Sequence, residues 1–209
     1  LSIGAPTHWP GDVTLFLPSD PISFVSHEGR STLQVLDGVA DLQLHPGPSL
    51  ELERISASAA VWSLQTGKRT VLSAQDTTLT MDQSKASANT YTFVATTNKL
   101  SPGDAARTAL RLPTDWPVTS ETFTVSGDIS FDKPWDISAL EQARPQPRRI
   151  NLELAEAVWS DLRLFFAADL TIDEAGTPTG TINIQAENWQ VMLDLAERSG
   201  ALPSGFRQQ

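Results

Sequence analysis

Apolar and polar residues alternate along several stretches of this chain, and this period of two constrains the fold more than any other feature. In the longest stretch, 162–173, every second residue from Leu162 to Ile172 is apolar. Neighbouring side chains of a β-strand point to opposite faces of a sheet, so the pattern is typical of a half-buried antiparallel strand. Shorter stretches of the same kind, rich in Thr, Val, Ile and Phe, are 31–36, 49–53, 90–95, 122–131, 150–154 and 181–186. The chain is therefore predicted to be mainly β.

The end of the longest strand leads into a hairpin and then a helix. Residues 174–178, EAGTP, are turn formers between two alternating stretches. Asn188 suits a helix N-cap, apolar residues follow it at helical spacing, and Gly200 suits the C-cap. The order strand, strand, helix is predicted. The apolar positions expected to be buried in this unit are Leu164, Phe166, Leu170, Ile182, Ile184, Met192 and Leu193.

The same unit is predicted to occur twice. Residues 79–108 align without a gap to 170–199, with identical residues at Leu79, Thr80, Asp82, Thr90, Ala95, Ala105 and Arg107. The tripeptide VWS recurs at 61–63 and 158–160. We therefore expect duplicated units at about 61–110 and 158–200, the first with a helix that has Ser101 as N-cap and Pro102 at its first position. The predicted fold is α+β: one domain, 1–209, with a curved antiparallel sheet of two strand-strand-helix halves and a few helices.

Composition excludes several classes of function. The 209 residues include no cysteine, which rules out disulfides and thiolate chemistry. The formal net charge of −10 argues against nucleic-acid binding, which needs clustered Lys and Arg. No stretch approaches the roughly 18 consecutive apolar residues of a membrane-spanning helix. Because the first residue is Leu1, we expect a processed or trimmed product, which leaves open a signal peptide or N-terminal anchor outside this chain.

No arrangement of residues predicts catalysis or a metal site. His8, His27 and His45 lie in separate segments without metal-ligand spacing, and the sequence has no G-x-S-x-G turn. The carboxylates of Asp173 with Glu174, and of Asp132 with Asp136, fall in predicted turns, where solvated acids are usual. The expectation is a protein that is not an enzyme and has no cofactor and no metal.

Two groups of side chains are candidates for binding. Six tryptophans against one tyrosine is an unusual balance, and Trp159, Phe165 and Trp189 lie near the junction of the long strand with the helix. We treat these three as a candidate apolar ligand site; the alternative is packing in the core and loops. Arg144, Arg148 and Arg149 form a basic run that could contact anionic headgroups, with a solvated proline-rich loop as the alternative.

Several long stretches resemble DUF2125, a family of uncharacterised alphaproteobacterial proteins. They are WPGDVTLFLPSDPISF, VADLQLHPGPSLELERISASAAVW and the segment from RINLELAEAVWSDLRLFFAADL through to residue 202. The resemblance implies an envelope protein with an N-terminal anchor or signal and with more chain beyond Gln209, and it implies no catalytic residues. More weakly, the strand pair LTID…G…I.I is similar to AsmA-type envelope proteins, whose long sheets are associated with lipid transport.

Together these observations predict a non-enzymatic periplasmic protein, tethered to the inner membrane by a segment absent from this chain. We expect its curved sheet to bind an acyl chain or another apolar ligand. The alternative is a structural or accessory module that binds a partner envelope protein and carries no ligand. The two differ in whether the concave face of the sheet is an open groove or is filled by the protein's own helices.

Overall fold

The computed structural model describes residues 2–4, 11–26, 29–109, 118–159 and 162–188, and the isolated residues 190, 193, 194 and 197. Within these ranges the chain forms a single antiparallel sheet of twelve strands. The strands are β1 Ser2–Gly4, β2 Asp12–Phe16, β3 Ile22–Ser26, β4 Gly29–Leu36, β5 Val39–Leu44, β6 Leu52–Thr66, β7 Arg69–Ser84, β8 Ser87–Pro102, β9 Thr122–Phe131, β10 Pro147–Trp159, β11 Leu162–Ile172 and β12 Pro178–Glu187.

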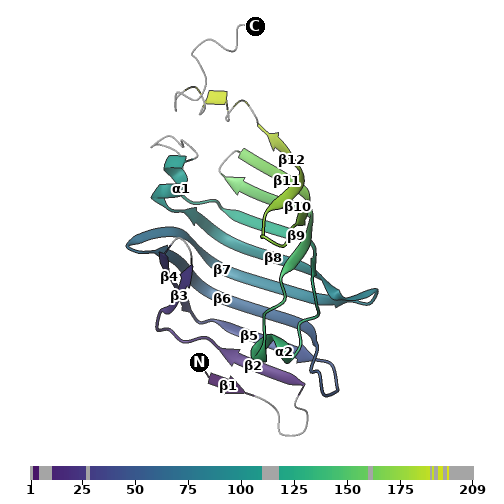
Figure 1. Cartoon of the computed structure of the whole chain (residues 1–209). Coiled ribbons are helices and arrows are strands. Elements are labelled where there is room, and N and C mark those ends of the chain that lie inside the picture. The colour runs from purple at the N-terminus through teal and green to yellow at the C-terminus, as the bar shows by residue number, and fades with distance from the viewer. Residues whose placement is uncertain are drawn as a thin grey trace.

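The strands follow one another through the sheet almost in chain order. The order is β1-β2-β5-β6-β7-β8-β9-β10-β11-β12; β4 pairs with the second half of β6, end to end with β5, and β3 pairs with β4. Figure 1 shows that the sheet curves into an open trough, with the strands running across it. The predictions of a mainly β chain and of a curved antiparallel sheet are therefore confirmed.

The α+β description is wrong in the weight it gives to helices. In the described part of the chain the helices are α1, Asp104–Ala109, and α2, Ser138–Glu141, of six and four residues. Ser101 and Pro102 do not start a helix, because they belong to β8 and pair with Ser73 and Leu72. A proline is tolerated there because it stands at the last position of the strand, where little of the ladder remains.

The structure does not support two duplicated strand-strand-helix halves. The sheet has no boundary between them, since β8 pairs with β9 along nine residues in unbroken register. The strands that the alignment makes equivalent also differ, because β8 has 16 residues and β12 has 10. Most of the helix expected after Asn188 lies outside the described residues.

Little of the apolar surface is fully buried. Among the described residues the buried hydrophobic ones are Val35, Leu52, Ala74, Tyr91, Ala139, Ala155, Ala157, Leu162 and Ala168, and five of these are alanines. The accessible surface is 13406 Å², whereas a compact monomer of 22.7 kDa exposes about 9,500 Å². A single-layer sheet accounts for the excess, because one layer cannot cover both of its own faces.

The burial predicted for the C-terminal strands is wrong at the edge of the sheet. Ile182 is 60% and Ile184 64% exposed, because β12 is the outermost described strand on this side. Leu164, Phe166, Leu170 and Leu193 are half-buried. Met192 lies outside the described residues. Leu162 is instead the centre of the packing here, 2% exposed and in contact with Trp159, Leu164 and Ala186.

One loop folds back over the sheet. Residues 132–146, which we call the strap, connect β9 to β10, and the amide of Asp132 donates to the carbonyl of Gln146 at 2.9 Å. In between, the strap reaches the start of β6, where the amide of Leu52 donates to the carbonyl of Trp135 at 2.7 Å. Figure 1 shows α2, which is part of the strap, in front of the strands at the β2 and β5 end. The strap therefore crosses one end of the trough.

Candidate functional site

Two adjacent rows of small and apolar residues run along the trough from β2 to β12. They follow from strand register, since each residue is paired with the next one along the row. The first row is Leu15, Ala40, Ala57, Leu79, Ala95, Val125, Ala155, Phe166 and Ile184. The second row is Val13, Leu42, Ile55, Met81, Phe93, Gly127, Leu152, Ala168 and Ile182. We call the side of the sheet that carries both rows the inner face, and the opposite side the outer face.

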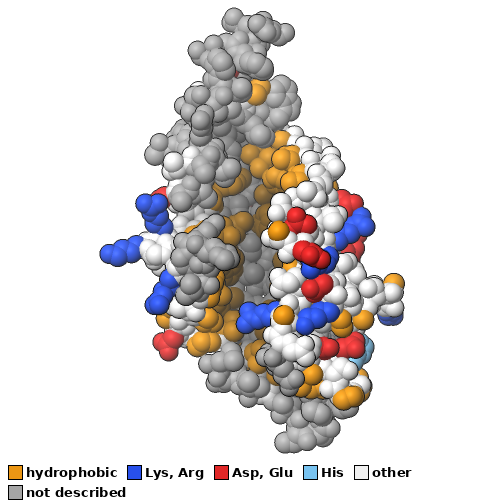
Figure 2. All heavy atoms as spheres, viewed as in Figure 1, with side chains coloured by type: hydrophobic (Ala, Val, Ile, Leu, Met, Phe, Trp, Pro, Cys, Tyr) orange, Lys and Arg blue, Asp and Glu red, His pale blue; other side chains and the backbone are white. Residues whose placement is uncertain are grey.

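Most of the inner face is only partly buried. The described row residues are half-buried or exposed apart from the buried Ala155, Ala168 and Gly127. Figure 2 shows a hollow with hydrophobic side chains along it and charged side chains on its flanks. With neighbouring strands about 4.8 Å apart, rows that cross nine strands extend for about 38 Å. The inner face thus forms a long apolar surface that runs perpendicular to the strands.

The outer face is polar and carries pairs of opposite charge or of hydrogen-bonding partners. Arg54 pairs with Asp82, and Arg163 lies 3.5 Å from Glu156. The hydroxyl of Thr92 donates to Asp128 at 2.6 Å. Each of these residues is next in sequence to an apolar residue of the inner face, such as Ile55 for Arg54 and Leu164 for Arg163, so the alternation of the sequence separates the two faces.

The strap covers the inner face at one end. Tyr91 lies on this face, two residues before Phe93, and is fully buried. Its ring meets Phe131 edge to face at 5.9 Å, and Phe131 meets Trp135 of the strap at 5.6 Å. The Tyr91 hydroxyl donates to the carbonyl of Leu52 at 3.2 Å, and burial raises the pKa of this phenol. The indole Nε1 of Trp135 is buried without a hydrogen-bond partner in the part of the chain that the structure describes.

The residues predicted to bind an apolar ligand do not lie together. Trp159 packs against Leu162 on the inner face. Phe165 lies on the outer face, where its strand neighbours are Glu156 and Gln185. Trp189 lies outside the described residues. A ligand on one face therefore cannot contact both Trp159 and Phe165, and the sequence prediction missed the rows of the inner face although the alternation that forms them was visible.

Two of the three arginines of the predicted basic run, Arg148 and Arg149, contact acidic residues of the protein itself. Arg149 forms two hydrogen bonds with Asp169, at 3.1 and 2.7 Å, and these raise the pKa of its guanidinium. Arg148 donates to the carbonyl of Asp173 at 2.9 Å and lies 3.7 Å from Asp132. Arg144 is exposed. Contact of these three with anionic headgroups stays a prediction.

The carboxylates considered for catalysis have local structural partners. Asp132 accepts from the amide of Gln146 at 2.8 Å, and Asp136 accepts from the amide of Ser138 at 2.9 Å. Asp173 accepts from the amide of Thr177 at 2.8 Å, inside the β11–β12 turn. These contacts agree with the interpretation of the acids as turn residues.

Neither a metal cluster nor a spanning helix is present in the described ranges. Among those residues no group of three or more His, Asp or Glu side chains could hold a metal ion. His45 instead shares a hydrogen bond of 2.8 Å with Gln83, while His8 and His27 lie outside the described residues. No helix in the same ranges has the length and hydrophobicity needed to cross a bilayer.

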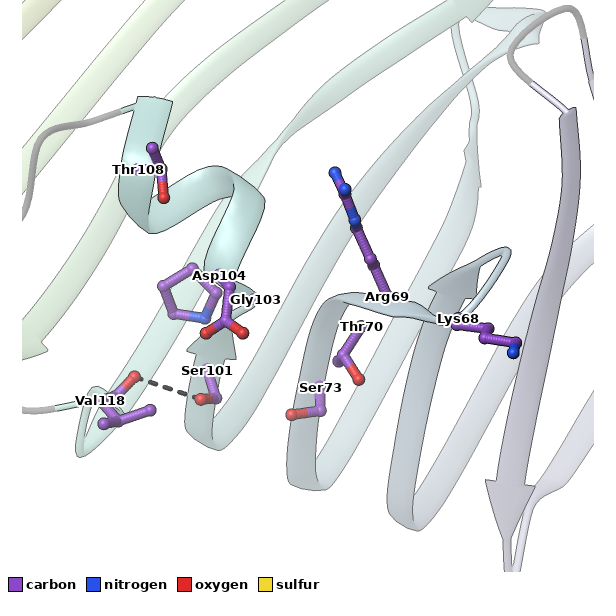
Figure 3. A pocket seen from close by; sticks show the side chains of 10 residues that line it. Lys68, Arg69, Thr70, Ser73, Ser101, Gly103, Asp104, Thr108 and Val118 are labelled. Carbon is purple, nitrogen blue, oxygen red and sulfur yellow. Dashed lines mark hydrogen bonds between the residues drawn. The ribbon is translucent and has the colours of Figure 1, made fainter.

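A pocket that the sequence analysis did not predict lies where the ends of β7 and β8 meet α1 (Figure 3). Its volume is about 810 Å³. The lining comprises Lys68, Arg69, Thr70, Ser73, Ser101, Pro102, Gly103, Asp104, Thr108 and Val118. The Ser101 hydroxyl donates to the carbonyl of Val118 at 3.2 Å. In the sequence, the two adjacent cations of the GKRT turn could have indicated this pocket, but they were not among the predicted site residues.

Comparison with known proteins yields a family and nothing more specific. No curated protein and no solved structure matches the chain, so the likeness to AsmA-type proteins stays a prediction. One family model matches, and it does so along residues 1–209, the whole of the sequence. The chain therefore belongs to the family DUF2125, described as an uncharacterized protein conserved in bacteria.

Proposed function

We propose that this protein is a non-enzymatic envelope protein, periplasmic and tethered to the inner membrane, whose inner face binds the acyl chain of a lipid. The observation that carries the proposal is the pair of apolar rows, which cross nine strands and are for the most part only half-buried. Soluble monomers seldom leave a large continuous apolar surface in water, and such surfaces usually mark a binding site.

The dimensions favour a chain-like ligand. The hydrocarbon core of a bilayer is about 30 Å thick, so a single acyl chain spans about 15 Å of it, which is less than half of the row length. Each methylene that leaves water for an apolar surface contributes about 0.8 kcal/mol. A narrow surface that runs perpendicular to the strands suits such a ligand, because every strand adds further apolar contact along its length.

The strap supports the same proposal, because it shows what packs on the inner face where that face is covered. At one end of the trough the strap packs through Trp135 against Phe131, and Tyr91 beside it is fully buried. Where no described element covers the inner face, a ligand would supply the missing contacts. The periplasmic location and the tether rest on what the family resemblance implies, and protease protection in spheroplasts would test them.

The first experiment asks whether lipid is present. Protein purified from its native bacterial membrane in a mild detergent is extracted with organic solvent, and the extract is analysed by mass spectrometry. We expect lipid in a fixed ratio to protein, above that of a soluble protein taken through the same steps. Absence of lipid from the wild type, together with no binding of a fluorescent fatty acid, would overturn the proposal.

Two neighbouring residues make a matched pair for the second experiment. Phe166 belongs to the inner face and Phe165 to the outer face, and both are half-buried. We expect Phe166→Glu to lose bound lipid and Phe165→Glu to retain it. Ile184→Glu, compared with Gln185→Glu, repeats the test on the edge strand, where Ile184 is 64% exposed and the change should leave the fold intact. Equal lipid retention in both members of each pair would contradict the proposal.

A partner protein is the second candidate, favoured by the edge of the sheet. β12 pairs with β11 on one side, and its other side has no partner strand within the described residues. A strand of another protein could pair there by β-augmentation. In that case Ile184→Glu should abolish co-purification of a defined protein while Phe166→Glu, one strand inward, leaves it unchanged.

A further inference from the structure

The pocket at the ends of β7 and β8 differs in charge from the rest of the molecule. Its lining carries the cations Lys68 and Arg69 against one carboxylate, Asp104, in a chain with a formal net charge of −10. In the described ranges the structure shows no ion pair for either cation, whereas Arg54, Arg148, Arg149 and Arg163 each lie within 4.0 Å of an acid. The two cations of the pocket are therefore available to an anion from outside.

The remaining polar lining supplies hydroxyl groups. Thr70, Ser73, Ser101 and Thr108 each carry one. Figure 3 shows the polar side chains of β7 on one side of the pocket and those of β8 and α1 on the other. Donors on two sides of a pocket match a group with several acceptor oxygens, and charge-assisted hydrogen bonds from Lys and Arg are the strongest kind available to it.

We propose that this pocket binds a phosphate group, carried either by a lipid headgroup or by a soluble phosphate ester. A phosphate offers more acceptor oxygens than a carboxylate, and the lining has two cations and the hydroxyls of Thr70, Ser73 and Thr108 to satisfy them, besides that of Ser101, which donates to Val118. The volume of about 810 Å³ lies in the range of small-molecule sites, so it leaves room for the group that is esterified to the phosphate. The inference goes beyond the proposed function, since phosphate binding here needs no lipid on the inner face.

The experiment measures binding of glycerol 3-phosphate to the whole chain by calorimetry at low ionic strength. The test variant is Arg69→Gln. The control is Lys85→Gln, which removes the same charge from the exposed β7–β8 turn at the opposite end of β7. We expect Arg69→Gln to raise the Kd about tenfold, as for loss of a hydrogen bond from a charged group, and Lys85→Gln to leave the Kd unchanged. An equal Kd for both variants, or no binding by the wild type, would overturn the inference.

A second arm separates the two sources of phosphate. Wild type and Arg69→Gln are incubated with phosphatidylglycerol vesicles and with glycerol 3-phosphate, and the bound amount of each is measured. Loss of both ligands in Arg69→Gln assigns the pocket to a headgroup, and loss of glycerol 3-phosphate alone assigns it to a soluble ester. Ile184→Glu keeps glycerol 3-phosphate binding in either case, so failure of the lipid proposal and failure of the phosphate proposal give different results.

Discussion

The inner and outer faces of the sheet are built by the same strands and differ in polarity: the inner face carries rows of apolar side chains, and the outer face carries charged and hydrogen-bonding pairs. On β7, for example, Leu79 and Met81 face inward while Thr80 and Asp82 face outward. The outer face satisfies its polar groups in pairs such as Arg54 with Asp82 and Thr92 with Asp128. The apolar side chains of the inner face cannot form such pairs, because a hydrophobic side chain is stabilised only when another group covers it.

This difference distinguishes the protein from an ordinary sandwich or α+β domain. In those folds a second layer covers the apolar face of the sheet. Here the described helices have six and four residues, and the strap covers one end of the trough. The inner face therefore divides into a packed part, around Leu162 and Tyr91, and an open part that includes Ile182 and Ile184.

The largest expected effect on stability tests this division within the inner face. Leu162→Ala should lower the free energy of unfolding by about 2–5 kcal/mol through lost transfer energy and a cavity, because Leu162 is 2% exposed and packs on Trp159 and Leu164. Ile184→Ala should lower it by less than about 1 kcal/mol, as expected for a side chain that remains mostly in water. Chemical denaturation measures both. Similar losses in the two variants would mean that the edge strand is covered as well.

A smaller effect is expected where the strap meets the inner face. Tyr91→Phe removes the hydrogen bond to the carbonyl of Leu52 and should cost about 1 kcal/mol. Burial raises the pKa of Tyr91, so the folded state retains the phenolic proton more tightly than the unfolded state. The stability linked to this group is complete below a pH of about 10, the unperturbed pKa, and is lost as the pH rises through the folded pKa.

The sequence makes this titration simple to follow. Tyr91 is the only tyrosine in the chain, so the absorbance of the tyrosinate reports on it alone. We expect an apparent pKa above that of free tyrosine in the folded protein, and no alkaline loss of stability from this source in Tyr91→Phe. If Tyr91 instead titrated with the pKa of free tyrosine, its hydroxyl would be exposed to solvent, and the strap would not cover this part of the inner face.

The smallest effect is expected on the outer face. Arg54→Ala breaks the pair with Asp82, whose side chains are 51% and 43% exposed. Such surface pairs contribute about 0–1 kcal/mol, and salt screens them. Thermal unfolding of wild type and variant at low and high salt should therefore differ little, and less at high salt. A loss as large as that of Leu162→Ala would contradict the contrast between the two faces.

Much of the strand pattern was predictable from local sequence. The strand 122–131 was predicted with the bounds that the structure gives to β9, and 162–173 differs from β11 by one residue. The longest strands, β6, β7 and β8, were seen only in fragments. The backbone has positive φ at Asp76 in β7 and at Lys99 in β8, and the register of β6 with β7 shifts between Leu64 and Gln65. Such irregularities interrupt the alternation of apolar and polar residues, so a pattern of period two does not continue through them.

The candidate site was less predictable, because it depends on residues far apart in the chain. Trp159 and Phe165 are six positions apart, yet the β10–β11 pairing places them on opposite faces. The strap depends on Trp135, which no sequence pattern distinguished from the other five tryptophans. Its contact with Leu52 is a long-range backbone hydrogen bond that no local pattern encodes.

The sequence by itself determined which side chains share a face, because alternation along a strand is a local consequence of backbone geometry. It placed Ile182 and Ile184 on the same face as Leu164 and Phe166, and the register agrees. Only the tertiary structure decided what covers that face. Burial depends on the elements that pack against a strand, and among the described elements the strap covers one end of the apolar rows while no second sheet or long helix packs along the rest.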